Sequence, residues 1–319
     1  GVNVSTLTAL THLDLNACGL TDLNVDSNVE LQYFDCSSNK LTALNVNNNA
    51  ALTMFDCSDN QLSTLRVSNN TALDKLDVSK NNLLNVNVRS NTVLKTLNVS
   101  DNAGITALAL GYNTGLETLE ASNTALTDID LSNNLEMKNL NLAGCSSMHI
   151  LDVSKNRSLI DLDISNTPFK KTVEVGYDLA IGVVFFNDGS VVKIVSNDET
   201  KAEWGYYGTT TNANSRTDGA TNTDKIVAKS PAAQWCRAKG TSWYLPALDE
   251  LEAVYNNKSK LNATLSSPSV GGTQLGTNYY WSSTENNNNY AYYVSFSSGS
   301  TNYGYTKGST YSVRAVRAL

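Results

Sequence analysis

The sequence has few of the residues on which most enzyme chemistry depends. Its 319 residues include only two histidines, His12 and His149, and both lie in the first half of the chain. Histidine-dependent chemistry in the second half is therefore excluded. Charged residues make up only 17% of the chain. No apolar run reaches the roughly 18 residues that a membrane-spanning helix needs, so the sequence predicts no direct membrane span.

Basic charge is scarce as well, and it is unevenly distributed. Residues 1–175 carry 11 Lys and Arg against 19 Asp and Glu, whereas residues 176–319 carry 12 against 11. A protein that binds nucleic acid needs a basic face that displaces counterions from the phosphates. Neither half offers such a face, so nucleic acid is excluded as a partner.

A signal peptide is also missing, because no basic start is followed by an apolar core. The residues after Gly1 fall inside a sequence repeat. We therefore expect the natural protein to begin further upstream, with additional repeats and any targeting or anchoring segment before Gly1.

A repeat of about 21 residues fills the first half. Residues 31–41 read LQYFDCSSNKL, which follows the pattern L-x-x-L-x-L-x-x-N-x-L. The lead positions of the units are Leu10, Leu31, Leu52, Leu73, Leu94, Leu116, Met137 and Leu159. The pattern closely resembles the leucine-rich repeat. It predicts a domain over residues 1–175 with seven full repeats and part of an eighth.

The physics of the repeat predicts a parallel β-solenoid. In L-x-x-L-x-L the last two apolar residues alternate with a polar one, as in a short strand with one buried face. Strands stacked about 4.8 Å apart form a parallel sheet, and no repeat is stable alone. An asparagine ladder can satisfy backbone groups where each coil turns. The expected ladder positions are Asn39, Asn60, Asn81, Asn102, Asn123 and Asn166, with Cys18 and Cys145 at equivalent places.

A polar stripe runs along the outward side of the predicted strands. Its members are Asp14, Asp35, Asp56, Asp77, Asn98, Glu120, Asn141 and Asp163. Stacked like charges repel, so the stripe does not serve stability. Two interpretations stay open: a face that binds a cation or a partner, or a solvated face whose repulsion water screens.

The five cysteines carry little redox information. Cys36 and Cys57 occupy inward strand positions of adjacent repeats, and Cys236 is alone in the second half. There is no C-x-x-C pair, so the pattern predicts neither a disulfide scaffold nor a zinc site. We expect all five thiols to be reduced.

A second domain, residues 176–319, follows the repeats. It has more Tyr and Trp and no 21-residue period. We expect residues 169–175 to form a last edge that caps the solenoid. The pattern then predicts strands at 180–186 and 191–195 around a tight turn, a loop at 204–224, helices at 225–239 and 248–255, and strands across 279–319.

Three segments of this domain resemble a known family. They are residues 233–251 (AQWCRAKGTSWYLPALDEL), 280–285 (YWSSTE) and 313–319 (VRAVRAL). In this order they resemble the variable proteins of diversity-generating retroelements, the group that contains the phage tropism determinant, and related domains of bacterial surface proteins. The resemblance implies an α+β C-type-lectin-like fold, ligand binding without catalysis, and a place at the cell surface or outside the cell.

The resemblance also implies a variable binding site. In such proteins an AAC-rich template is copied with errors at adenines, which turns Asn codons into codons for Tyr, Ser, Thr and Asp. Residues 278–312 contain six Asn, eight Tyr and eight Ser, which is 22 of 35 residues. They alternate with the apolar residues Trp281, Val294, Phe296, Val313 and Val316. The alternative is an ordinary polar loop of low complexity.

Strand alternation sorts the candidate binding residues. Val294 and Phe296 should face the core, the residues between and beside them should face outward, and Tyr303 and Tyr305 should share a face. Tyrosine offers large rigid contact area, and Asn and Ser offer adaptable hydrogen bonds. The candidate ligand-binding residues are Asn286, Asn287, Asn288, Asn289, Tyr290, Tyr293, Ser295, Ser297, Asn302, Tyr303, Tyr305 and Tyr311. The alternative for each tyrosine is half-buried packing in the sheet.

Catalytic and metal-binding patterns are missing from the second half. The calcium motifs E-P-N, Q-P-D and W-N-D of animal C-type lectins do not occur, and the acidic stretch 218–224 is too loosely spaced to favour a calcium loop. The distantly similar formylglycine-generating oxidases need reactive cysteines, and Cys236 is single and flanked by core residues. Glu285 has no acidic partner for glycoside hydrolysis. We therefore expect no enzymatic activity, no cofactor and no metal.

The sequence favours an adhesin or receptor-like protein. Its ligand, an unknown protein or glycan, would bind the second domain, and a further protein partner could bind the repeats. The alternative function is an invariant structural or assembly component of the cell envelope or of fimbriae, which would use the repeats for protein contacts.

Overall fold

The computed structural model describes residues 2–319 and divides the chain into two compact units, Gly1–Thr172 and Val173–Leu319. The division falls three residues before the expected boundary at 175/176. Gly1, before which we expect further sequence, lies outside the described residues. No helix in the described part of the chain is long and apolar enough to cross a membrane.

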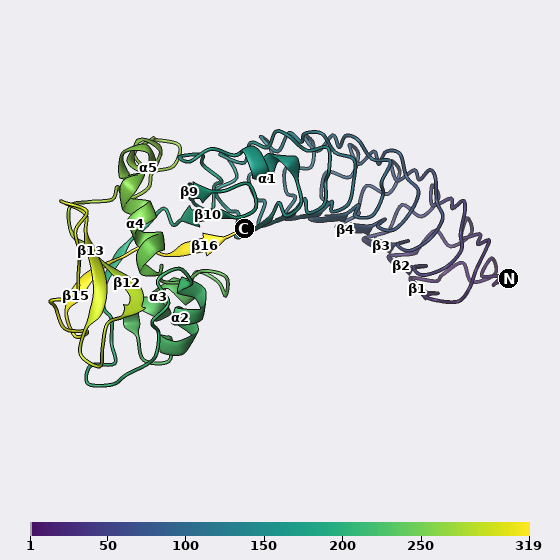
Figure 1. Cartoon of the computed structure of the whole chain (residues 1–319). Helices are drawn as coiled ribbons and strands as arrows, with labels where there is room; N and C mark the ends of the chain where they lie inside the picture. The colour runs from purple at the N-terminus through teal and green to yellow at the C-terminus, as the bar shows by residue number, and fades with distance from the viewer. Residues whose placement is uncertain (1) are drawn as a thin grey trace. The chain divides into compact units, whose positions relative to one another are not determined.

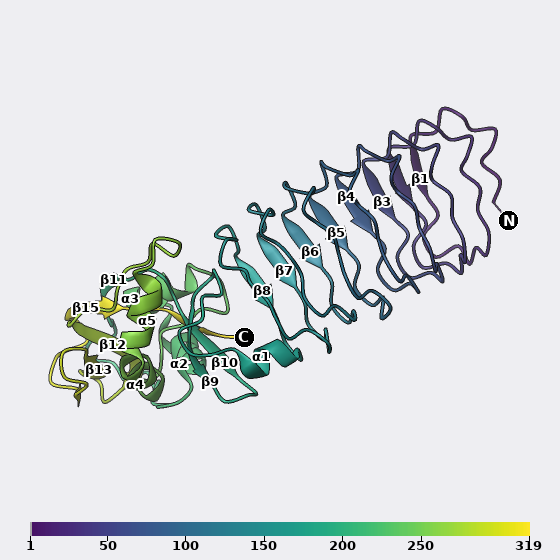
Figure 2. The ribbon, with the colours of Figure 1, turned by 90° about the horizontal axis from the view of Figure 1, so that it is seen from above.

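The first unit is a parallel β-solenoid, as predicted. Its strands pair in sequence order and in register, so that Leu13 lies opposite Phe34 and Phe34 opposite Phe55. Figures 1 and 2 show the strands side by side along one face of the solenoid. They are β1 (His12–Asp14), β2 (Tyr33–Asp35), β3 (Met54–Asp56), β4 (Lys75–Asp77), β5 (Thr96–Asn98), β6 (Thr118–Glu120), β7 (Asn139–Asn141) and β8 (Asp161–Asp163).

The predicted asparagine ladder is present in the first repeats. The Asn39 side chain donates to the carbonyl oxygen of Leu15 at 2.9 Å and accepts from the backbone N–H of Leu20 at 2.8 Å. The assignment of Asn123 and Asn166 to this ladder is wrong. Both have positive φ, as does Ser38 beside Asn39, and the 22-residue repeats shift the ladder position to Thr124 and Thr167.

A second ladder was not predicted. Its members are Asn28, Asn49, Asn70, Asn91, Asn113, Asn134 and Asn156, all of which are buried. Asn70 is typical: its Nδ2 donates to the carbonyl oxygens of Val46 and Asn49, at 2.9 and 2.8 Å, in the preceding coil. The second ladder therefore joins consecutive coils about half a repeat away from the first, as the positions of Asn39 and Asn49 show.

The solenoid ends in a helix and not in the expected edge strand. Helix α1 (Pro168–Thr172) begins at a proline, which suits the first turn because its missing N–H would have no partner there. The Thr167 Oγ1 accepts from the backbone N–H of Lys170 at 3.2 Å, and Phe169 is buried. The expectation of a strand at 169–175 is therefore wrong.

The second unit is an α+β domain with two sheets (Figure 1). The smaller sheet has the order β16-β10-β9, from β9 (Val183–Asn187), β10 (Val192–Val195) and β16 (Val316–Ala318). The larger sheet has the order β11-β15-β12-β13-β14, from β11 (Thr200–Glu203), β12 (Tyr279–Glu285), β13 (Ala291–Ser295), β14 (Thr301–Asn302) and β15 (Thr310–Val313). The predicted hairpin at 180–195 is confirmed as β9 and β10.

Four helices accompany these sheets: α2 (Gly219–Ile226), α3 (Pro231–Arg237), α4 (Leu248–Asn256) and α5 (Lys258–Leu265). The single helix expected at 225–239 is wrong, because Ser230 caps a new helix that starts at Pro231. Helix α2 begins inside the expected loop, where the side chain of Asp218 accepts from the backbone N–H of Thr221. Helix α4 is confirmed.

The core of the second unit lies around α4 and the larger sheet. Leu248, Leu251, Val294 and Phe296 are all buried in it, together with Tyr280. The predicted inward orientation of Val294 and Phe296 is confirmed. This core leaves the opposite face of β12, β13 and β15 to carry other side chains.

Candidate ligand-binding site

Four tyrosine side chains meet on the larger sheet. Tyr279, Tyr293 and Tyr311 come from β12, β13 and β15, and Tyr305 comes from the segment between β14 and β15. The ring centroids of all six pairs lie 5.1 to 5.8 Å apart, in the tilted or edge-on arrangements that aromatic rings prefer. We call these four residues the tyrosine cluster.

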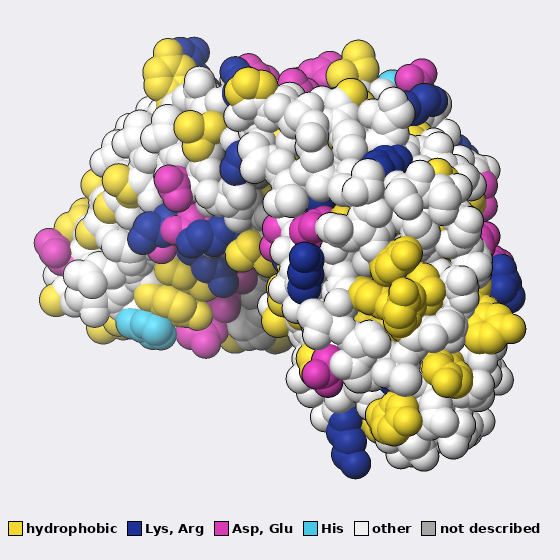
Figure 3. Space-filling view, turned by 90° about the vertical axis from the view of Figure 1, so that its left-hand side faces the viewer, with side chains coloured by type: hydrophobic (Ala, Val, Ile, Leu, Met, Phe, Trp, Pro, Cys, Tyr) yellow, Lys and Arg dark blue, Asp and Glu magenta, His cyan; other side chains and the backbone are white. Residues whose placement is uncertain are grey.

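The tyrosine cluster has a buried base and an exposed top. Trp281 is fully buried, and its ring centroid lies 4.6 Å from that of Tyr311. Tyr293 is only 3% exposed, whereas Tyr279 is 39% and Tyr305 46% exposed. Figure 3 views the molecule from the side on which β13 and β15 lie in Figure 1, and it shows hydrophobic side chains gathered among uncharged polar ones. Two exposed rings are thus held by two less exposed ones.

A hollow of about 260 Å³ lies beside the cluster. It is lined by Lys201, Thr277, Asn278, Tyr279, Ser297, Thr310, Tyr311 and Ser312. Tyr279 and Tyr311 belong to both the hollow and the cluster. A ligand that contacts these rings therefore also reaches hydroxyl and amide groups.

Two predicted binding residues of β13 are less accessible than expected. Tyr293 and Ser295 lie on the face of the strand opposite Val294, but they are buried. The other tyrosines of the cluster cover Tyr293, and the Oγ of Ser295 lies 2.8 Å from the Oγ of Ser297. The expectation that both are exposed is wrong, whereas Ser297 is exposed.

The expectation that Tyr303 and Tyr305 share a face is also wrong. Tyr305 belongs to the tyrosine cluster, whereas the Tyr303 ring lies 5.6 Å from that of Tyr292. Strand β14 ends at Asn302, which pairs with Tyr293, so strand alternation does not continue to Tyr305. Tyr303 is therefore exposed at a separate place from the cluster.

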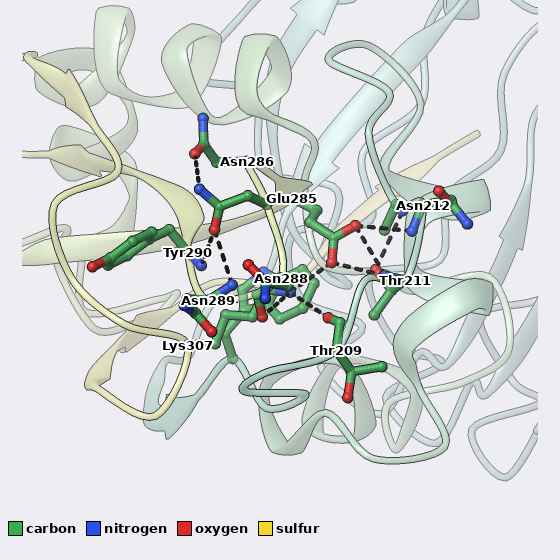
Figure 4. Close-up of polar contacts among 12 residues, drawn as sticks. Thr209, Thr211, Asn212, Glu285, Asn286, Asn288, Asn289, Tyr290 and Lys307 are labelled. Carbon is green, nitrogen blue, oxygen red and sulfur yellow. Dashed lines mark hydrogen bonds and ion pairs between the residues drawn. The ribbon is translucent and has the colours of Figure 1, made fainter.

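The loop between β12 and β13 carries five further predicted residues, Asn286–Tyr290, and we call it the asparagine loop (Figure 4). The Asn287 Oδ1 accepts from the backbone N–H groups of Asn289 and Tyr290, at 2.9 and 3.0 Å. The Asn286 Nδ2 donates to the hydroxyl of Tyr292 at 2.9 Å. The side chains of Asn288 and Asn289 make no hydrogen bond to any described residue of the chain. Half of the asparagines thus shape the loop, and the other half are free to contact a ligand.

The buried carboxylate of Glu285 anchors the start of this loop. Glu285 and Lys307 form an ion pair with a distance of 2.5 Å between Oε1 and Nζ, and their side chains are 4% and 0% exposed. Glu285 also accepts from the backbone N–H groups of Thr211 and Asn212, each at 2.8 Å. Figure 4 shows these groups converging on the carboxylate. Glu285 therefore ties the segment around Thr211 to the end of β12.

Lys307 anchors the backbone of the asparagine loop. Its Nζ donates to the carbonyl oxygens of Thr209 at 2.9 Å and Asn288 at 3.2 Å, and its backbone N–H donates to that of Asn289 at 2.9 Å. The ammonium also lies 4.7 Å from the centre of the Trp204 ring. Burial lowers the pKa of Lys307, and the hydrogen bond and charge of Glu285 oppose that shift. None of these contacts uses the side chain of Asn288 or Asn289.

The two less exposed phenols of the tyrosine cluster, Tyr293 and Tyr311, have raised pKa values. Burial raises the pKa of Tyr311, and the neighbouring phenols raise it further. Burial, followed by Tyr305 and Tyr279, likewise raises the pKa of Tyr293. The surface can therefore make aromatic contacts and neutral hydrogen bonds at neutral pH.

The cysteine and two of the carboxylates of the second unit that were considered for chemistry are buried or engaged in structural contacts. Burial raises the pKa of the Cys236 thiol, which disfavours the reactive thiolate. Glu285 is neutralised by Lys307, and Asp218 caps a helix. Between residues 2 and 319, no group of three or more His, Cys, Asp and Glu side chains is placed to hold a metal ion.

Sequence reasoning missed several residues of this site. Tyr279 touches all three other members of the cluster, and its place two residues before Trp281 puts it on the same face. That signal was available in the Asn/Tyr/Ser-rich segment. Lys201 and the segment around Thr211 carry no comparable signal, because they approach the site only through folding.

A match to a protein family agrees with the family resemblance inferred from the sequence of the second unit. Residues 193–317 match the Lcl C-terminal domain family. This match confirms the resemblance to the retroelement variable-protein type of domain. No curated protein matches the chain.

Among solved structures, the chain is similar to bacterial leucine-rich-repeat proteins. The functional domain of InlJ from Listeria monocytogenes is 25% identical, with 52% of this chain and 51% of that chain covered and a TM-score of 0.35. The LRR protein LIC12759 of Leptospira interrogans is 22% identical, with 52% and 46% covered and a TM-score of 0.49. YopM of Yersinia pestis is 20% identical, with 51% of each chain covered and a TM-score of 0.41.

The matched region spans about half the length of each of these three solved structures. The C-terminal region of the chain thus matches the Lcl C-terminal domain. In the sequence it follows a solenoid whose structural neighbours are bacterial leucine-rich-repeat proteins.

Proposed function

We propose that this chain is a non-enzymatic ligand-binding protein, an adhesin or receptor-like module that is displayed on the bacterial cell surface or secreted. A protein or glycan ligand binds the tyrosine cluster and the asparagine loop, whose Tyr290 pairs with Thr306, the residue after Tyr305. The observation that carries the proposal is the meeting of four tyrosines from three strands and one loop of the segment 279–311, two of them with exposed rings. Such clusters provide rigid contact area at low entropic cost.

The same site is suited to sequence variation. The asparagine loop is held through the carbonyl oxygens of Asn288 and Asn289, and any residue except proline supplies an equivalent backbone. Tyr279 and Tyr305 stand on the buried base formed by Trp281 and Tyr293. We therefore propose that exposed positions of the site vary between copies of the protein while the base and the Glu285–Lys307 pair do not.

A pair of libraries tests this tolerance. One library randomises Tyr279, Asn288, Asn289 and Tyr305, and the other randomises Trp281, Ser283, Glu285 and Lys307. We expect most members of the first library and few of the second to stay folded, as measured by protease resistance on the cell surface. Equal folded fractions would contradict the proposed division between framework and variable positions.

An array of extracellular proteins and glycans tests binding itself. The variant Tyr279→Ser/Tyr305→Ser should lose at least about tenfold in affinity for whatever the full chain binds, because aromatic anchors dominate such interfaces. Tyr112→Ser/Tyr207→Ser is the matched control, since both of these tyrosines are exposed outside the cluster. A ligand whose affinity is unchanged by the first variant does not bind at the proposed site.

A further inference from the structure

The solenoid presents an open sheet face with two outward rows of side chains. The first row holds His12, Tyr33, Met54, Lys75, Thr96, Thr118, Asn139 and Asp161. The second is the polar stripe that begins with Asp14 and ends with Asp163. The two rows lie two residues apart on each strand, which is about 6.6 Å.

From β4 onward, neutral asparagines alternate with the carboxylates of the polar stripe and donate hydrogen bonds to them. The Asn98 Nδ2 donates to the Oδ2 of Asp77 at 2.8 Å, and the Asn141 Nδ2 donates to the Oε2 of Glu120 at 2.8 Å. Beside the first row, Lys138 forms an ion pair with Glu117 at 2.6 Å. Asp77 and Glu120 of the stripe thus accept from an asparagine on the next strand, and Glu117 beside it has a lysine partner.

The face of β1–β3 leaves its charge unpaired. Asp14, Asp35 and Asp56 each accept through Oδ1 from the backbone N–H two residues later, at 3.0, 2.9 and 2.9 Å. Within residues 2–319, no Lys or Arg lies within ion-pair distance of any of the three. Burial raises the pKa of Asp56, and so do the charges of Asp77 and Asp35, while hydrogen bonds from Ser58 lower it. A cation brought to this face would relieve that repulsion.

Apolar and aromatic side chains stand beside these three carboxylates. The rings of His12 and Tyr33 stack with centroids 4.0 Å apart and planes 8° from parallel. Met54 follows at the next position of the row. We call the six residues His12, Asp14, Tyr33, Asp35, Met54 and Asp56 the β1–β3 face.

We propose that the β1–β3 face binds an arginine-bearing segment of a partner protein. A guanidinium is planar, stacks on aromatic rings and pairs with carboxylates through two parallel hydrogen bonds. The β1–β3 face offers both contacts side by side. A bare metal ion fits less well, because no group of acidic, histidine or cysteine side chains in the described chain is arranged to hold one. This proposal does not depend on the C-terminal site.

Fluorescence anisotropy with the full chain tests the proposal. The probe is a fluorescein-labelled peptide of sequence GRGRGRG, and GKGKGKG is its lysine counterpart. Asp14→Asn/Asp35→Asn/Asp56→Asn should weaken GRGRGRG binding about tenfold, from the loss of three charge pairs with the peptide. The matched control Asp77→Asn/Glu120→Gln/Asp163→Asn removes the same charge and should change affinity less than threefold. Both variants should fold, since asparagine already stands at positions 98 and 141 of the stripe.

A second variant separates arginine recognition from general attraction of cations. Tyr33→Ala should weaken GRGRGRG binding more than GKGKGKG binding, because lysine does not stack as guanidinium does. Equal loss in the two triple variants would overturn the proposal in favour of diffuse attraction. Equal binding of the two peptides, or no saturable binding at low salt up to about 1 mM, would overturn it as well.

Discussion

At the scale of single residues, the candidate site depends on one buried lysine. Lys307 places its ammonium between the Glu285 carboxylate, two backbone carbonyls and the Trp204 ring. A buried charge is tolerated only when such partners replace water. The lysine therefore fixes the asparagine loop without fixing the side chains of that loop.

Removing one member of this pair should be costly. Lys307→Met leaves the Glu285 carboxylate buried without a countercharge, and we expect a loss of about 3–5 kcal/mol in the free energy of unfolding. All four tryptophans of the chain lie after residue 176, so tryptophan fluorescence in urea reports on the second unit. Glu285→Gln/Lys307→Met should lose less than Lys307→Met alone. An equal loss in the double variant would show that charge balance is not the cause.

The four asparagines of the loop should differ in their effect on stability. Asn287→Ala removes the acceptor for two backbone N–H groups and should cost about 0.5–1.5 kcal/mol. Asn288→Ala removes no hydrogen bond of its side chain and should change stability by less than about 0.5 kcal/mol. Urea unfolding of both variants measures the difference. Equal costs would contradict the assignment of Asn287 to shaping the loop.

At the scale of elements, the repeats could be read from the sequence and much of the second unit could not. The 21-residue period places strands such as β2 and β3 directly, because each repeat meets the same neighbours. The ladder register failed where two repeats gained a residue and Asn123 moved to a positive-φ turn. Counted from the lead residues Leu116 and Leu159, the ladder position falls on Thr124 and Thr167, but the asparagine just before each threonine resembles the ladder residue more closely.

Helix α5 and the Tyr303–Tyr305 segment were missed for a different reason. Only Leu261 and Leu265 of α5 are buried, so its apolar pattern is weak. Near Tyr305, Gly304 follows a two-residue strand, and alternation no longer predicts the face. The site itself was partly predicted: composition identified the segment, but the convergence of Tyr279 with Tyr305 depends on the packing of four strands.

The second asparagine ladder should be essential to the solenoid. Asn70→Ala removes two buried hydrogen bonds, to the carbonyl oxygens of Val46 and Asn49, each of which keeps one backbone N–H donor. We expect a loss of about 1–3 kcal/mol in the free energy of unfolding. Asn69→Ala is the matched control, because the Asn69 side chain makes one exposed hydrogen bond, to Asn47. Urea unfolding followed by circular dichroism compares them. A control as destabilised as Asn70→Ala would contradict the role of the ladder.

At the scale of the whole molecule, stability should fall in alkaline solution. Burial raises the pKa of Tyr244, Tyr280, Tyr293 and Tyr311 above the usual value of 10.0. In the unfolded chain these phenols ionise near pH 10, so the unfolded state then binds fewer protons than the folded state. Their contribution to stability is therefore complete below pH 10 and is lost as the pH rises through the folded pKa values.

Thermal unfolding followed by tryptophan fluorescence measures this effect. We expect a lower melting temperature of the second unit at pH 10.5 than at pH 8. Tyr293→Phe/Tyr311→Phe should reduce the difference, because phenylalanine does not ionise. A difference that is unchanged in this variant would assign the alkaline loss to other groups.

We propose that the molecule combines a constant framework with a variable surface that recognises the ligand. Sequencing this locus in many isolates tests that separation most directly. The account predicts that substitutions concentrate at Tyr279, Asn288, Asn289 and Tyr305, and that Glu285 and Lys307 stay unchanged. Substitutions spread evenly over the second unit, or absent from these four positions, would contradict it.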